Sequence, residues 1–184
     1  MDSREPNSAP TPAATPAQWD AEGVAAPLQG GRVRGVRLWP SAPDPTVFAD
    51  GAAQASWRYV NLDTDGVATK ADYIAACAEQ IPLPDYLGRN WDALEEALGD
   101  QGVDAANSAA AGLLVVWRNW TEFATAEPAS FQVALAIWRS VASDWRERLE
   151  GAAVVLSVDS VEVTAVLPES IVDEITGISR VRSA

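Results

Sequence analysis

Acidic side chains are concentrated in one stretch of the chain. Six of the twenty residues in segment 85–104 are acidic, and only Arg89 is basic. Residues three and four apart are neighbours on a helix, so Asp92, Glu95 and Glu96 would gather on one turn. Such a turn could be an ordinary solvated helix face, a pair of catalytic carboxylates, or a surface that receives a positively charged partner.

The residue pattern alone favours the solvated face. Asp92 and Glu96 form a like-charge i,i+4 pair, which costs about 0.2 to 0.5 kcal/mol on an isolated helix, although the helix dipole favours Asp92 near the N-terminus. A glycosidase-like pair needs carboxylates set across a cleft, one of them with its pKa raised by burial. Two acids on one exposed turn do not meet that requirement, so we do not expect an enzyme.

The remaining composition excludes several kinds of active site. The chain has no histidine, which removes Ser-His-Asp and Cys-His arrangements and the commonest zinc ligand. Cys77 is the only cysteine and lies on an apolar helical stripe, so we expect a core thiol and no internal disulfide. The run GGRVRG lacks the following helix and the Lys-Ser/Thr pair of a phosphate loop. We therefore expect neither a cofactor nor a metal.

The charge of the whole chain favours a basic partner. The chain carries 26 acidic and 13 basic residues, a formal net charge of −13, so a nucleic acid or an anionic membrane would repel it. Its start has no basic segment followed by an apolar run, and no stretch approaches the roughly eighteen apolar residues of a membrane span. We expect a soluble, cytoplasmic protein.

An α/β order of elements surrounds the acidic turn. Thr69 with Asp72 resembles a capping box for one helix, which ends before Pro82, and Asn90 caps the next helix, which carries the acidic turn. Continuous apolar runs predict strands buried on both faces of a parallel sheet. The other expected elements are a strand at 57–62, a strand at 112–117, a long helix from 131 to 149 and a strand at 152–158.

Both ends of the chain differ in composition from this core. Residues 1–30 are rich in Ala, Pro, Thr and Ser and are expected to form a disordered tail. Residues 31–54 are expected to be an N-terminal extension, in which the alternation of 31–39 allows an edge strand and PSAPDP is a breaker. The core covers 55–158, and residues 159–184 form a C-terminal extension in which VEVTAVL allows a further strand.

The segment LPDYLGRNWDALEEAL (83–98) resembles the barstar family, whose members are intracellular inhibitors of a small secreted ribonuclease. The family pattern is Leu-Pro, an acid, Tyr, an aromatic residue, Gly, any residue, Asn, Leu, Asp, Ala, Leu, Trp and Asp. A second segment, LLVVWRNWTEF (113–123), is similar to the family's buried strand, which ends in Trp-Arg before a helical turn. The positions that match the first pattern are Leu83, Pro84, Asp85, Tyr86, Gly88, Asn90, Asp92, Ala93 and Leu94.

The resemblance covers residues 55–158 and implies an α/β fold, with a three-stranded parallel sheet packed by helices. It also implies that the second helix and the loop before it plug the active site of a nuclease, where acids replace substrate phosphates. Asp92 matches one inhibitory aspartate, and Glu96 falls where the family has its dominant aspartate. The partner-binding residues implied by position are Tyr86, Gly88, Asn90, Trp91, Asp92, Glu95 and Glu96.

The chain departs from the family on this same surface. Leu87 replaces an aromatic residue, Glu95 replaces a tryptophan, and residues 99–101 replace a Thr-Gly-Trp stretch before an inserted Ala-rich loop at 102–111. These departures bear on the identity of the partner more than on the fold.

The long helix carries one further contact position. An alignment on Trp138-Arg139 places Ser140 at the family's contact glutamate and Asp144, an acid, one turn later, whereas an alignment on Gly151 gives other residues. Asp144 is the long-helix acid that we include among the predicted partner-binding residues. The sequence therefore predicts a barstar-like inhibitor of a basic secreted ribonuclease or nuclease toxin. The alternative is an immunity or regulatory module on the same fold whose target is not a ribonuclease.

Overall fold

A four-stranded parallel sheet lies at the centre of the computed structural model, which describes residues 19–40, 43–84 and 88–158. The strands are β1 (Gly35–Pro40), β2 (Trp57–Asp63), β3 (Gly112–Arg118) and β4 (Gly151–Val158), in the order β1-β4-β3-β2. The predictions for Tyr86, for the first eighteen residues and for the C-terminal extension fall outside the described residues.

The expected three-stranded sheet is wrong, because β1 adds a fourth strand. β1 pairs in parallel with β4, from Gly35 opposite Ala153 to Pro40 opposite Val158. Every residue of β4 is buried, and a strand buried this completely needs hydrogen-bonding neighbours on both edges. The edge strand allowed by the alternation of residues 31–39 is confirmed, as is the α/β class with a parallel sheet packed by helices.

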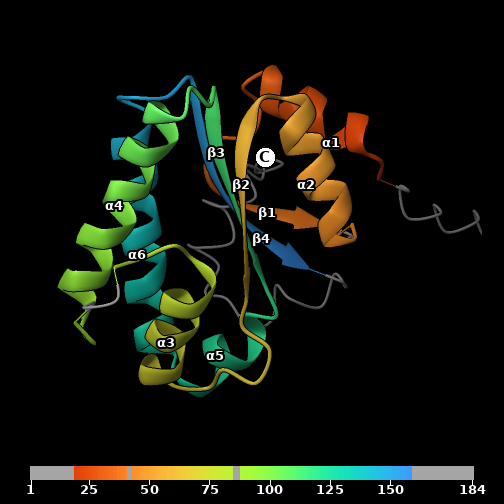
Figure 1. Ribbon diagram of the computed structural model, residues 1–184. Helices are drawn as coiled ribbons and strands as arrows, with labels where there is room; N and C mark the ends of the chain where they lie inside the picture. The colour runs from red at the N-terminus through yellow and green to blue at the C-terminus, as the bar shows by residue number, and fades with distance from the viewer. Residues whose placement is uncertain (1–18, 41–42, 85–87, 159–184) are drawn as a thin grey trace, which may run out of the picture.

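Helices cover both faces of the sheet, so the molecule has three layers (Figure 1). One face carries α1 (Ala21–Gln29) and α2 (Pro45–Gln54), and the other carries α3 (Lys70–Gln80), α4 (Trp91–Asn107), α5 (Thr121–Ala126) and α6 (Pro128–Trp145). Side chains alternate between the two faces along each strand. In β3, Leu114 and Val116 pack with α1 and α2, whereas Leu113, Val115 and Trp117 pack with the other four helices.

The expectation of a disordered tail is wrong for residues 19–30, most of which form α1. Asp20 caps this helix by accepting a backbone N–H of its first turn at 2.8 Å. Val24 and Leu28 are buried, and a side chain at Gly51 of α2 would meet the Cβ of Val24. The segment is poor in large apolar residues because two helices this close need small ones.

Capping side chains mark where other helices begin. Thr69 caps α3 as predicted, because the Asp72 N–H donates to Thr69 Oγ1 at 3.2 Å. The Asp72 carboxylate accepts the Thr69 hydroxyl at 2.7 Å, whereas in a full capping box it would accept the Thr69 backbone N–H. Asn90 caps α4 as predicted, accepting the Ala93 N–H at 2.9 Å. Asp44 caps α2, so PSAPDP, interpreted as a breaker, contains a helix start.

α4 is longer than predicted, because the expected loop at 102–111 continues the helix as far as Asn107. Gly102 and Ala105 are buried and follow Leu98 on the inner face at helical spacing. The long helix α6, in contrast, ends at Trp145, before its predicted end at 149. The two helices pack side by side on the same face of the sheet (Figure 1).

The core beneath these helices is aromatic. Tyr73 is fully buried, stacks on Phe123 with ring centroids 4.9 Å apart, and accepts the Trp138 indole N–H at 2.7 Å. Cys77 is the predicted core thiol, and burial raises its pKa to about 12. No helix within the described ranges is long and apolar enough to cross a membrane.

Candidate protein-binding surface

Four carboxylates stand at every fourth position of α4. This acidic stripe consists of Asp92, Glu96, Asp100 and Asp104, and all four residues are exposed. At about 1.5 Å of rise per residue, the stripe is about 18 Å long. The sequence prediction included Asp92 and Glu96 but not the other two. The signal for both is the continued spacing of four. The loop expected at 102–111 hides this signal for Asp104 but not for Asp100, which precedes that loop.

The acidic stripe is unfavourable for α4 on its own. Each like-charge i,i+4 pair costs about 0.2 to 0.5 kcal/mol, and Asp104 lies in the last turn, where the helix dipole opposes a carboxylate. That turn contains no basic residue. Among the described residues, the one ion pair joins Arg118 to Asp63, 3.7 Å apart and outside the stripe. The described part of the chain therefore leaves the stripe without a paired counter-ion.

A hollow of about 310 Å³ lies between α4 and the end of α6. This α4/α6 hollow brings the predicted site residues Glu95 and Glu96 together with a third, Asp144, which is distant from them in sequence. The buried ring of Trp145 also lines it, and its indole N–H donates to the carbonyl oxygen of Leu98 at 3.1 Å. Because these contacts connect the two helices, the acids of α4 and Asp144 form one surface.

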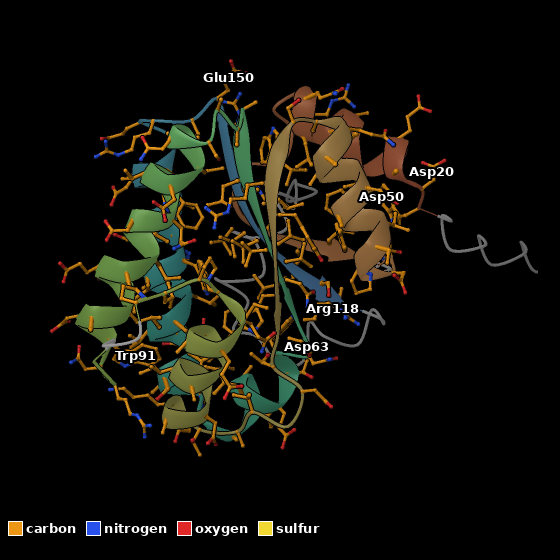
Figure 2. All side chains as sticks on the ribbon, viewed as in Figure 1. Asp20, Asp50, Asp63, Trp91, Arg118 and Glu150 are labelled. Carbon is orange, nitrogen blue, oxygen red and sulfur yellow. The ribbon has the colours of Figure 1, made fainter. Side chains whose placement is uncertain are left out.

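Three more of the predicted residues lie where α4 begins. A side chain at Gly88 would lie 3.1 Å from Asn90 Nδ2, so the chain is close to the capping side chain there. Trp91 is half-buried, with its ring centroid 6.0 Å from that of Tyr73 and the Lys70 ammonium 5.0 Å above its face. Figure 2 shows Trp91 at this end of α4, close to α3. The ring therefore has both a structural contact and an accessible part.

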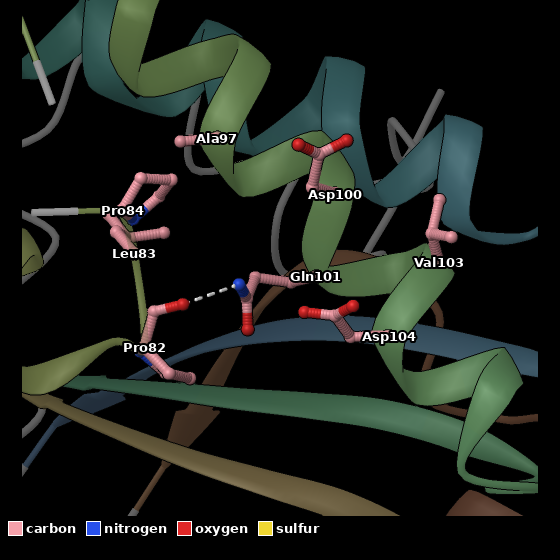
Figure 3. Close-up of a pocket in the computed structure, with 8 residues that line it drawn as sticks. All are labelled: Pro82, Leu83, Pro84, Ala97, Asp100, Gln101, Val103 and Asp104. Atoms are coloured by element: carbon pink, nitrogen blue, oxygen red, sulfur yellow. Dashed lines mark hydrogen bonds between the residues drawn. The ribbon is translucent and has the colours of Figure 1, made fainter. Parts of the chain in front are cut away.

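A second hollow, of about 370 Å³, lies on the side of α4 that faces residues 82–84 (Figure 3). Gln101, only 3% exposed, reaches across it and donates from Nε2 to the carbonyl oxygen of Pro82 at 3.0 Å. The side-chain oxygen of Gln101, Oε1, accepts a hydrogen bond from Arg58 Nη2 at 3.2 Å. We call this site the proline hollow; it is lined by Pro82, Leu83, Pro84, Ala97, Asp100, Gln101, Val103 and Asp104.

The geometry of α4 suits binding better than catalysis. Its acids project along one exposed helix face, and paired acid and base groups would have to stand across a cleft. In the described residues, no group of three or more His, Cys, Asp or Glu side chains is arranged to hold a metal ion. A carboxylate surface of this kind can pair with arginine and lysine side chains of another protein.

The fold and this surface define a class, a parallel α/β protein that presents an acidic helix between two hollows. Residues 57–157 match the family model described as Barstar (barnase inhibitor). The chain belongs to the barstar family, and the resemblance seen in the sequence is confirmed. The match runs from β2 into β4 and leaves out α1, β1 and α2, which supply the fourth strand and one helical layer.

Solved structures with a similar fold include two of the Aeropyrum pernix ORC2 protein. The ADP form has a TM-score of 0.56 and 14% identity, over 91% of this chain and 49% of that one. The structure of the ADPNP-ADP complexes has a TM-score of 0.55 and 13% identity, over 85% of this chain and 44% of that one. The chain thus spans about half the length of these ORC2 chains, and at such identity the likeness shows the fold alone. A comparison with curated proteins found no match.

Proposed function

We propose that this chain is a non-enzymatic inhibitor that binds a basic ribonuclease or nuclease toxin and blocks its active site with α4 and the segment before it. The observation that carries the proposal is the acidic stripe. It lies on a helix within the family match, is exposed along its whole length, and has no paired counter-ion among the described residues. A basic partner would supply that counter-ion.

The inhibition is steric and electrostatic. Asp92 and Glu96 take the places of substrate phosphates against the basic side chains of the nuclease, with which carboxylates form charge-assisted hydrogen bonds. Glu95 and Asp144, which share the α4/α6 hollow with Glu96, extend the contact to α6. The net charge of −13 attracts a basic partner over a longer distance and raises the association rate, an effect that salt weakens.

The residues around the start of α4 have a different role. Asn90 fixes the first turn, and so the direction in which Asp92 projects. Trp91, which is partly exposed, and Tyr86, which the family resemblance implies, are proposed as aromatic contacts, since aromatic side chains often anchor protein interfaces. Gly88 allows the chain to pass close to the capping side chain, where a larger residue would crowd Asn90 and Ala93.

An RNA-cleavage assay tests the proposal, with barnase as the first target and other small basic ribonucleases after it. We expect the chain to inhibit one of them at a one-to-one ratio, and the Asp92→Asn/Glu96→Gln variant to lose inhibition. The matched control is Glu22→Gln/Asp50→Asn, which removes the same charge from exposed positions of α1 and α2. Figure 2 shows Asp50 across the sheet from α4. Equal inhibition by both variants would contradict the proposal.

A second candidate is an immunity or regulatory module whose target is not a ribonuclease. It is favoured by the extension of the acidic stripe to Asp100 and Asp104, beyond the matching segment 83–98, and by Glu95 in place of a tryptophan. Capture of partners from the same cell, followed by a ribonuclease assay on each, separates the two candidates. A basic partner that binds through α4 and cleaves no RNA would favour this second one.

A further inference from the structure

We propose that the proline hollow is a second anchoring site of the same interface and receives one arginine or lysine side chain of the basic partner. The identity of that partner as a basic protein rests on the proposed function. The site itself is additional, because it lies on the side of α4 that faces residues 82–84, and its Asp104 lies beyond the matching segment 83–98 and is not among the predicted partner-binding residues.

The walls of the proline hollow have few hydrogen-bond donors to offer. Pro82 and Pro84 carry no N–H, and the Leu83 N–H donates to the carbonyl oxygen of Ile81 at 2.7 Å. One N–H of the Gln101 side-chain amide donates to the carbonyl oxygen of Pro82 at 3.0 Å. Carboxylates only accept when ionised. An occupant that brings its own donors, such as a guanidinium or an ammonium group, is therefore complementary to the site.

The charge of the proline hollow favours a cation. Asp100 and Asp104 line it one helical turn apart, and both are exposed. Arg58 reaches this region but bonds to Gln101 Oε1, and within the described residues it forms no ion pair with either aspartate. The α4/α6 hollow differs in this respect, because Arg148 lines it together with the acids.

The apolar lining matches the stem of a long basic side chain. Pro82, Leu83, Pro84, Ala97 and Val103 contribute apolar atoms to the lining, and residues 82–84 face the two aspartates across the hollow (Figure 3). Arginine and lysine bury their methylene stems against apolar surface while the charged group stays near polar atoms. A volume of about 370 Å³ is near the lower end of ligand pockets, about 300 to 1,000 Å³, which suits one such side chain.

The position of the proline hollow connects it to the rest of the interface. Asp100 and Val103 line both hollows, so α4 forms a ridge between them. Asp100 is one turn from Glu96 and two turns from Asp92 on the same exposed face. A partner that covers the first half of α4 therefore extends to the proline hollow, where a basic residue adds to specificity.

An NMR titration of the labelled full-length chain tests the site without the nuclease. The probe is N-acetyl-arginine N-methylamide, and the control probe is the citrulline compound, which has the same shape but no charge, at matched ionic strength. We expect the amide signals of Leu83, Ala97 and Val103 to shift with the arginine probe and not with citrulline. In the Asp100→Asn/Asp104→Asn variant the apparent affinity should fall about tenfold, whereas Glu22→Gln/Asp50→Asn should behave as the unaltered chain.

The results of the titration distinguish a failure of this site from a failure of the proposed function. Equal shifts with arginine and citrulline, or an unchanged response of the Asp100→Asn/Asp104→Asn variant, would overturn the proline hollow as a cation site even if the chain inhibits a ribonuclease through Asp92 and Glu96. Shifts spread evenly over all exposed acids, with no preference for residues 82–84, would also overturn it. Specific binding of the probe without inhibition of any nuclease would leave the hollow supported and remove the proposed function.

Discussion

The ring of Trp145 occupies the space in which a side chain at Gly102 would begin. A Cβ added at Gly102 would overlap the Trp145 ring, which is only 1% exposed and is held by its hydrogen bond to the Leu98 carbonyl oxygen. This contact sets how closely α4 and α6 approach each other. It therefore also sets the position of the acidic stripe relative to Asp144.

The contact predicts opposite effects for the same substitution at two glycines of α4. Gly102→Ala should lower the free energy of unfolding by about 1 to 3 kcal/mol, because the buried ring cannot move aside without strain. Gly99→Ala should raise it by up to about 1 kcal/mol, since no atom lies near the added methyl group and alanine favours the helix. Urea unfolding of both variants measures this. Effects of the same sign would mean that the packing of Trp145 on Gly102 does not restrict α4.

The cost of the acidic stripe predicts that removing its last charge stabilises the chain. Asp104→Asn should raise the free energy of unfolding by about 0.3 to 1 kcal/mol at low salt, because it relieves repulsion from Asp100 and an unfavourable interaction with the helix dipole. The gain should shrink as salt screens both effects. Asp92→Asn is the matched control at the favourable end of the dipole and should gain less or lose stability. A lower stability of Asp104→Asn would contradict this description of the stripe.

The cap of α4 predicts that Asn90→Ala costs about 1 kcal/mol of stability. The Ala93 N–H would lose its acceptor and the first turn would loosen, which also weakens binding through Asp92 although no charge is removed. Asn90→Asp keeps an acceptor and should retain stability. Thermal unfolding of the two variants checks this. An alanine variant as stable as the asparagine chain would show that the cap is dispensable.

Several of these features could be predicted from local sequence, and others depend on contacts between distant segments. The caps at Thr69 and Asn90, and the buried strands, follow from side-chain chemistry and periodicity within a few residues. α1 was missed because it is stabilised by contact with α2 at Gly51 rather than by large apolar residues. The alternation of residues 31–39 allows the edge strand β1, but its place in the sheet does not follow from the family resemblance, which implies three strands and begins after β1.

The residues of the candidate site also divide into those that local sequence predicts and those that depend on contacts between distant segments. Asp92, Glu95 and Glu96 could be placed on one turn from spacing alone. The proximity of Asp144 to Glu95 and Glu96 depends on the packing of α6 against α4, which no local pattern encodes. Gln101 and Pro82, whose hydrogen bond spans the proline hollow, are nineteen residues apart. Local spacing therefore predicts the charges of Asp92, Glu95 and Glu96, but not the hollows on either side of α4.

The buried thiol predicts a loss of stability in alkali. Burial raises the pKa of Cys77 to about 12, whereas an unfolded cysteine ionises near 8.5. The unfolded chain therefore releases a proton that the folded chain keeps, so this contribution to stability is complete below about pH 8.5 and is lost as the pH rises toward 12. The free energy of unfolding should fall by up to about 1.4 kcal/mol per pH unit in this range.

A Cys77→Ala variant isolates this contribution. Its stability at neutral pH should be lower because the buried side chain is smaller, but its slope between about pH 8.5 and 9.5, below the ordinary range of tyrosine ionisation, should be shallower. Urea unfolding at several pH values measures both. Identical slopes for the two proteins would show that the thiol ionises alike in the folded and unfolded chains.

Asp92 and Glu96 are proposed to bind the basic active site of a ribonuclease. Titration calorimetry of the chain against the ribonuclease that it inhibits tests this proposal most directly. We expect the Asp92→Asn/Glu96→Gln variant to bind at least about a hundredfold more weakly, since unpairing a buried charge pair costs about 2 to 5 kcal/mol, with little change in its melting temperature. The Glu22→Gln/Asp50→Asn control should bind like the unaltered chain. Undiminished binding by the Asp92→Asn/Glu96→Gln variant, or a large loss of its stability with binding intact, would contradict the account.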